Sequence, residues 1–217
     1  MDVKHALKTA QSNELLISSN KVLTIILDAA HGEEVPGKRS PDGIFREYAW
    51  SRRIIAKLKE RLISIGYTVY ETNETNKEIG LTTRKNKANS FPGSYKVLLS
   101  IHNNAAGNGS TWMNATGIEF YTTKGQTMSD AFAECLAKSF QKNFPNEKLR
   151  TNTIDGDLDK EENFTVLMGS SYYAVLAEIL FQDNKSDVEK LNDSVWCDRC
   201  IDAFITGIEF FNWILNK

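Results

Sequence analysis

The stretch that most constrains the fold is residues 21–32, KVLTIILDAAHG, in which an apolar and largely β-branched run ends at polar residues. Such a run is typical of a strand that is buried on both faces of an α/β sheet. Asp28 and His31 follow as the run ends. Because ligands of open α/β sheets bind beyond the carboxyl ends of the strands, this stretch predicts a buried strand that places polar side chains at a binding site.

Two later segments have the same strand character and also carry polar residues. Residues 95–101, YKVLLSI, end at His102, and residues 173–180, YAVLAEIL, contain a single charge, Glu178. Between them and the first segment, apolar residues recur at helical spacing, most clearly over residues 45–65. Strands that alternate with helices indicate an α/β fold.

The whole pattern predicts the fold class and the order of elements. We expect an α/β protein with a single domain, built on a mostly parallel or mixed twisted sheet with helices on both faces. At 217 residues the chain has the size of one such domain. Besides the segments above, we expect helices over residues 6–17, 82–89, 128–140 and 195–215, strands over residues 67–70 and 117–122, a short strand that starts at Val166 and Leu167, and irregular structure over residues 144–162.

Composition argues against several classes of protein. The formal net charge is −2 and charges of both signs are interspersed, so we expect no nucleic-acid surface. No apolar run reaches the roughly 20 residues that span a bilayer, which argues against membrane insertion. Residues 1–20 form a polar leader with a short helix and lack the apolar core of a signal peptide, so we expect synthesis in the cytoplasm.

The three cysteines are assigned no chemistry. Their odd number argues against a full disulfide framework. Cys197 and Cys200 form a CxxC pair, but no second pair or nearby histidine completes a zinc site of that type. Because the pair lies in an apolar helical pattern, we interpret both as buried small hydrophobic residues.

Two histidines and one glutamate have the chemistry of a hydrolytic zinc site. His31 and His102 follow two buried strands, and Glu47 lies in the early turns of the intervening helix. Two imidazoles and one carboxylate leave a fourth zinc position open for a water, whose pKa zinc lowers from about 15.7 towards 7. A strand-end histidine can equally be a hydrogen-bonded structural residue, a glutamate in the first turn favours the helix dipole, and Glu33 or Glu34 could replace Glu47 as the ligand.

Glu178 has the chemistry of a proton carrier. A carboxylate near a strand end, partly removed from water, can have a raised pKa and can pass a proton from water to a leaving amine. A lone glutamate without a partner in a buried strand would otherwise cost several kcal/mol.

Several short segments, taken in order, resemble one enzyme family. The family is the zinc-dependent N-acetylmuramoyl-L-alanine amidases of the amidase_3 type, and the similar segments are DAAHG at 28–32, Glu47 opening a helix, TRKNKAN at 83–89, LLSIHNNA at 98–105, GIEFY at 117–121 and VLAEILFQDN at 175–184. The segments span nearly the whole chain from Lys21 onward. Each is weak alone, but the ordered set is specific.

The resemblance implies roles for the residues that the chemistry selects. The family's ligands are the histidine of the first motif, the glutamate at the helix start and the histidine of the SIH motif, which implies that His31, Glu47 and His102 bind Zn²⁺. The glutamate of the late strand is catalytic, which implies Glu178. Asn104 matches an asparagine near the family's substrate groove, although a turn or capping role explains it equally well.

The chain departs from the family pattern at packing and turn positions. Ala30 stands where a glycine usually precedes the first histidine, Ile179 and Leu180 replace a glycine after the catalytic glutamate, and Tyr173 replaces a proline. These changes affect the local backbone and the substrate preference but leave the reactive groups intact. Asp28 keeps an acidic residue of the family, either as a partner of a ligand histidine or as a cap of the strand end.

The resemblance implies a peptidoglycan hydrolase. The family cleaves the amide between the lactyl group of N-acetylmuramic acid and the L-alanine of the stem peptide, so residues 21–217 are expected to be a zinc amidase domain. We also expect the protein to be a monomer. Because peptidoglycan lies outside the cytoplasm, the protein must reach it by release or export. The alternatives are another zinc hydrolase of this architecture, such as a carboxypeptidase or deacylase, and a wall-binding or toxin-partner module without catalysis.

Overall fold

The apolar stretch near the start of the chain forms strand β1 (Leu23–Ala29), all of whose residues are buried. The structure is a computed structural model that describes residues 2–11, 20–154, 156–169 and 171–217. Within these residues, β1 lies inside a six-stranded sheet of order β2-β1-β3-β6-β4-β5. The other strands are β2 (Thr68–Glu71), β3 (Tyr95–Asn104), β4 (Ile118–Thr122), β5 (Lys160–Glu161) and β6 (Tyr173–Phe181).

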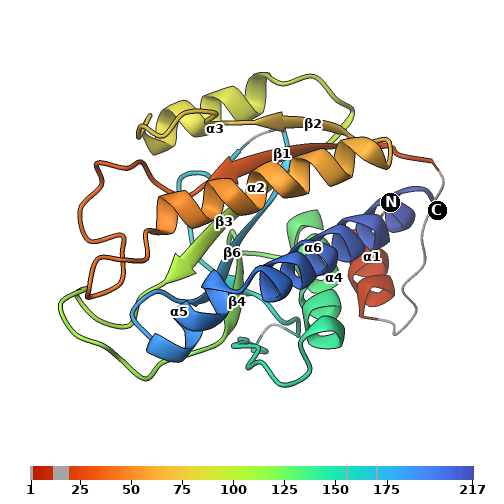
Figure 1. The fold of residues 1–217 in the computed structure, drawn as a ribbon. Coiled ribbons are helices and arrows are strands. Elements are labelled where there is room, and N and C mark those ends of the chain that lie inside the picture. The colour runs from red at the N-terminus through yellow and green to blue at the C-terminus, as the bar shows by residue number, and fades with distance from the viewer. Residues whose placement is uncertain (1, 12–19, 155, 170) are drawn as a thin grey trace.

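Strand direction brings several strand ends to one edge of the sheet. β1 pairs in parallel with β2 and β3, and β3 pairs in parallel with β6. β4 runs antiparallel to β6, and the short β5 runs parallel to β4. The sheet is therefore mixed and mostly parallel, as predicted, and the carboxyl ends of β1, β3 and β6 lie at the same edge (Figure 1).

Helices cover the two faces of the sheet unequally. Three long helices and β1, β3 and β6 share one core; they are α2 (Glu47–Ser64), α4 (Met128–Asn143) and α6 (Ser194–Leu215). The short α1 (Val3–Ala10) contacts α4 and α6, and α5 (Lys185–Asn192) follows β6. The other face carries α3 (Leu81–Ser90), whose Ala88 packs with Ile26 and Leu98 (Figure 1).

Successive residues of β1 belong to different cores. Ile25 and Leu27 pack with the long helices, whereas Ile26 packs on the face covered by α3. Side chains alternate across a strand, so a strand with apolar layers on both sides needs an unbroken apolar run. This packing explains the pattern that identified the strand in the sequence.

Most predicted elements are confirmed to within a few residues, and one is wrong. Val166 and Leu167 lie in a turn, in which the Leu167 amide donates to the Phe164 carbonyl, and not in a strand. Both side chains are buried in the α3-side core, so their apolar character reports burial and not strand pairing. The sequence did not predict α5, and β5 lies within residues 144–162, which were expected to be irregular. Residues 12–17 of the first predicted helix lie outside the described residues.

The cysteines agree with the expectation from the sequence. All three cysteines are buried free thiols, and Cys197 and Cys200 lie within α6. Among the described residues, none of the helices has the length and apolar character that crossing a membrane requires.

Candidate metal centre

Three predicted ligands meet at the carboxyl edge of the sheet. His31 follows β1, Glu47 is the first residue of α2, and His102 lies near the end of β3. Glu47 Oε1 is 2.9 Å from His102 Nδ1 and 3.4 Å from His31 Nε2. The two imidazole rings meet edge to face, with ring centroids 4.9 Å apart. One donor atom from each side chain thus lies within 4.8 Å of the others, as a shared metal ion requires.

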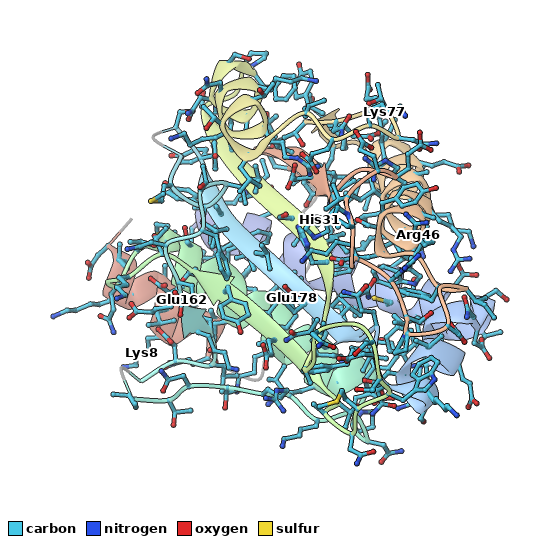
Figure 2. The ribbon with its side chains drawn as sticks, turned by 90° about the vertical axis from the view of Figure 1, so that its left-hand side faces the viewer. Lys8, His31, Arg46, Lys77, Glu162 and Glu178 are labelled. Atoms are coloured by element: carbon cyan, nitrogen blue, oxygen red, sulfur yellow. The ribbon has the colours of Figure 1, made fainter. Side chains whose placement is uncertain are left out.

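The first turns of α2 join the ends of β1 and β3. The Ser51 hydroxyl accepts a hydrogen bond from the Ala30 amide (3.0 Å) and donates one to the Ile101 carbonyl (2.6 Å). Ser51 lies one turn after Glu47, so the same helix end supplies one ligand and ties together the segments that carry the other two. Figure 2 views this side of the molecule, with His31 and Glu178 near the centre of the view.

Two arginines hold the backbone that carries His31. This residue has a φ of +45°, in the left-handed region that residues with a β-carbon rarely adopt. Its carbonyl oxygen accepts hydrogen bonds from Arg52 (2.8 Å) and from Arg84 (3.2 Å). Arg84 is almost fully buried, forms an ion pair with Asp28 and also donates to the Ala29 carbonyl. Asp28 is thus linked to His31 through Arg84.

Glu47 is buried and both of its carboxylate oxygens have hydrogen-bond partners. Oε1 accepts from the Asn103 amide (3.2 Å), and Oε2 accepts from Gln182 Nε2 (3.0 Å). Burial alone would raise the pKa of Glu47, but the hydrogen bonds and charges of His102 and His31 outweigh it and hold that pKa well below its usual range. Glu47 is therefore an anion throughout the neutral range.

The two histidines respond differently to this carboxylate. Burial dominates at His31 and lowers its pKa, so its imidazole is neutral at pH 7 and can donate a lone pair to a metal. Burial also lowers the pKa of His102, but the closer Glu47 carboxylate outweighs burial and raises the pKa overall. His102 therefore keeps its proton to a higher pH than His31 does. A metal ion that binds His102 must displace that proton.

Glu178 lies beside the three ligands on β6. It occupies the register position opposite His102 in the parallel β3–β6 pair. Its Oε2 atom is buried and, among the described residues, has no hydrogen-bond partner. Burial raises the pKa of Glu178 to about 8, and the negative charge of Glu47 adds to the shift. This carboxyl group can therefore hold or release a proton near neutral pH.

A bulge in β6 follows Glu178. Between the register pairs His102–Glu178 and Asn104–Phe181, β3 advances by two positions and β6 by three. Leu180, inside the bulge, has a φ of +58°. Glycine takes this conformation most readily, but in this chain a leucine takes it at the bulge.

Asn104 lies at the end of β3 beside a charged group on β4. Its amide donates to Glu119 Oε2 (2.9 Å), while its own Oδ1 accepts from the Ala105 amide (2.8 Å). Glu119 lies opposite Glu178 in the β4–β6 pair and also contacts the positive side chains of Arg150 and Lys160. Asn104 thus makes one hydrogen bond within the turn and one to Glu119, which lies beside Glu178. Its role in substrate binding remains a prediction.

The alternative ligands lie outside the metal cluster. Glu33 forms an ion pair with Lys77 (2.6 Å), and Glu34 accepts a hydrogen bond from the Glu78 amide (3.0 Å). Among the described residues, the group of side chains with ligand atoms within 4.8 Å of one another contains His31, His102 and Glu47. Neither alternative glutamate belongs to this group.

Several supporting residues were not identified from the sequence. Gln182 orients Glu47, Ser51 joins two strand ends, and Arg84 holds the His31 backbone. Arg84 and Gln182 lie inside segments that resemble family motifs, and this position is the one signal in the sequence that could have marked them. Their partners are far away in the chain, so only the fold reveals what they contact.

Comparison with known proteins gives the family. The family model of amidase_3, described as N-acetylmuramoyl-L-alanine amidase, matches residues 25–210. A probable cell wall amidase, LytH, of Staphylococcus epidermidis is 28% identical over 89% of this chain and 60% of the relative. The amidase AmiC of Neisseria meningitidis is 25% identical over 85% of this chain and 51% of the relative. The chain thus spans little more than half the length of these two relatives.

Solved structures show the same fold. An N-acetylmuramoyl-L-alanine amidase from Clostridium difficile 630 superposes with a TM-score of 0.73 at 25% identity, over 87% of this chain and 96% of the other. The CwlD amidase from Clostridioides difficile, solved with the GerS lipoprotein, superposes with a TM-score of 0.76 at 23% identity, over 88% of this chain and 98% of the other. With the family model covering most of the sequence, this chain belongs to the amidase_3 family of N-acetylmuramoyl-L-alanine amidases.

Proposed function

We propose that this chain hydrolyses the amide bond between the lactyl group of N-acetylmuramic acid and the L-alanine of the stem peptide in peptidoglycan. One observation carries the proposal: three metal-ligand side chains converge beside a buried carboxyl group in a chain of this family. We also propose that the protein acts on the cell wall outside the cytoplasm and does so as a monomer.

Zinc fits the proposed ligands His31, Glu47 and His102. Two imidazole nitrogens and one carboxylate oxygen within 4.8 Å of one another are the donor set of a catalytic zinc ion with an open position. When bound, zinc supplies polarisation of the substrate carbonyl and lowers the pKa of a water molecule in the site to about 7. Gln182 and Ser51 support this fit, because they fix the Glu47 carboxylate and the helix end that carries it.

Glu178 is proposed to move the proton. Its Oε2 atom lacks a donor among the described residues, so it can accept a proton from the attacking water and deliver it to the nitrogen of the leaving L-alanine. A positive charge among the three ligands would lower the Glu178 pKa from about 8 towards neutrality. A pKa near the working pH allows the group both to take and to give the proton.

The test is digestion of purified sacculi by the zinc-loaded protein, with mass spectrometry of the new end groups. The proposal expects a free lactyl carboxylate and a free L-alanine amine in equal amounts. Glu178→Gln should retain zinc and lose about 10²–10⁴-fold in turnover, the usual contribution of a general acid–base group. Glu162→Gln, a change at an exposed glutamate, is the matched control and should leave turnover unchanged.

The same digest separates the alternatives. Release of a terminal amino acid would instead identify a zinc peptidase, and loss of an acyl group would identify a deacylase. Zinc retention without cleavage of any sacculus would indicate a binding module. Sedimentation of the zinc-loaded protein at assay concentration tests the monomer.

A further inference from the structure

A second group of buried carboxylates lies away from the metal centre. Asp130 is in the first turn of α4, and Asp157 and Asp159 lie in the segment that leads into β5. One oxygen from each lies within 4.8 Å of the others, and each residue is only 2–3% exposed. The group adjoins Thr122 at the end of β4, and β4 runs antiparallel to β6. It therefore lies towards the opposite end of the sheet from Glu178.

The hydrogen bonds around this group leave carboxylate oxygens without donors. The Thr122 hydroxyl lies 2.9 Å from Asp130 Oδ1 and 2.6 Å from Asp159 Oδ2, but it has one proton and can donate to only one of them. The other oxygen of Asp130 accepts from the Thr127 amide in a capping box. Asp159 Oδ1 is fully buried and has no hydrogen-bond partner among the described residues. A buried carboxylate oxygen in this state calls for a cation or a proton.

The nearby charges also favour a bound cation or a proton at this group. Within the described residues, neither Asp130 nor Asp159 forms an ion pair with a lysine or arginine, and Glu134, one turn further along α4, adds another buried carboxylate. Burial, with repulsion from Asp157, raises the pKa of Asp159 to about 9 and that of Asp130 to about 6. Like charges at this spacing repel one another strongly when they are removed from water.

We propose that Asp130, Asp157 and Asp159 bind a hard divalent cation, and that Ca²⁺ is the ion they fit best. The donors are all oxygens, which hard cations prefer, and the group contains no histidine or cysteine of the kind that zinc favours. The spacing of Asp157 and Asp159 places two carboxylates on alternate residues of one loop, as calcium loops do. Three carboxylates, the Thr122 hydroxyl and water molecules can supply the six to eight oxygens that Ca²⁺ takes.

The ion would fix the segment that carries Lys160, an ion-pair partner of Glu119. Lys160 directly follows Asp159, and its ammonium group lies 2.8 Å from Glu119 Oε1. Glu119 in turn lies opposite Glu178 in the β4–β6 pair. An ion held by the carboxylates would therefore stabilise the folded protein and hold Lys160 against Glu119.

The test is calorimetric titration of the zinc-loaded protein with CaCl₂ after removal of bound calcium. The proposal expects one calcium per chain in addition to zinc, with a melting temperature that rises with calcium concentration. Asp159→Asn and Asp157→Asn should each abolish the binding and the rise, and the near-isosteric change should preserve the fold. Asp198→Asn, at an exposed aspartate of α6, is the matched control and should bind calcium like the wild type.

Two results would overturn the proposal. The first is a wild-type protein that binds no calcium at millimolar concentration, with Asp159→Asn at least as stable as the wild type; that result would identify a carboxyl pair that shares a proton. The second is calcium binding that survives both substitutions. Because Glu178→Gln leaves these residues untouched, it should still bind calcium, so failure of the amidase proposal and failure of this one are distinguishable.

Discussion

Replacing Arg84 with methionine tests whether a buried ion pair holds the backbone of His31, the first proposed metal ligand. The left-handed conformation of His31 costs a residue with a β-carbon about 1–2 kcal/mol. A hydrogen bond from a charged donor contributes about 1.5–3 kcal/mol, and the His31 carbonyl receives one from Arg84 and one from Arg52. The two arginines together can therefore offset the strain, and one alone can do so only narrowly.

The expected loss of stability follows from what the substitution leaves behind. Methionine retains most of the apolar stem of Arg84 but removes the cation, so the buried Asp28 carboxylate loses its charged partner. Removing one side of a buried ion pair costs about 3–5 kcal/mol. Since Thr72 and Ser100 still donate hydroxyl hydrogen bonds to Asp28, we expect the lower end, about 3 kcal/mol. With His31 less firmly held, zinc affinity should fall about 10–100-fold.

Urea denaturation of the zinc-free protein and a competitive zinc titration measure the two effects. In a double-mutant cycle, Asp28→Asn with Arg84→Met should cost less than the sum of the single changes, with a coupling energy of about 1–3 kcal/mol. Lys87→Met, at an exposed position of the same helix, is the matched control and should change neither quantity. Additive effects, or unchanged zinc affinity in Arg84→Met, would refute the reasoning.

Three further predictions follow from the backbone and the charges of the site. Leu180→Gly should relieve about 1–2 kcal/mol of left-handed strain but remove a fully buried side chain that contributes at least about 3 kcal/mol. Urea denaturation should therefore show a net loss of stability, and a stabilised variant would contradict the packing described for Leu180. Gly32→Ala should lower the zinc content measured by atomic absorption, because the added β-carbon would overlap the Glu78 backbone; full zinc occupancy would rule out this close approach. In zinc-free protein the Glu47 carboxylate raises the His102 pKa, so this pair's stabilisation is complete below pH 6.5, the unperturbed value, and is lost as pH rises through the higher folded value. Zinc must displace that proton, so the gain in melting temperature on adding zinc should be larger at pH 8 than at pH 6, and the reverse order would exclude the pairing.

The strands and the edge that carries the site could be predicted because burial and strand direction leave a pattern in the sequence. β1, β3 and β6 are apolar on both faces, and parallel strands place their carboxyl ends together. Strand direction alone therefore placed His31, His102 and Glu178 at one edge of the sheet, although the pairing register was unknown. The register itself, which sets His102 opposite Glu178, depends on contacts between strands and was not predictable.

The rest depended on contacts between distant parts of the chain. An apolar pair such as Val166 and Leu167 signals burial but not the backbone pairing that makes a strand. Polar residues give still less information, because Arg84 and Gln182 have the same local sequence signals whether they face water or a buried carboxylate. The bulge at Leu180 was hidden for a related reason: leucine gives no sign of a left-handed backbone, which the surrounding pairing imposes.

The roles proposed for Glu47 and Glu178 depend strongly on such contacts. Both are glutamates at the same edge, yet Glu47 accepts hydrogen bonds at both oxygens and lies against two imidazoles, so it stays ionised and suits a ligand. Glu178 has a buried oxygen without a donor among the described residues, and its pKa rises to about 8, so it suits a proton carrier. Environments that push the pKa values of two like groups apart assign their roles. The number of donors around each carboxylate, and not the residue type, therefore suits Glu47 to the proposed role of metal ligand and Glu178 to the proposed role of acid.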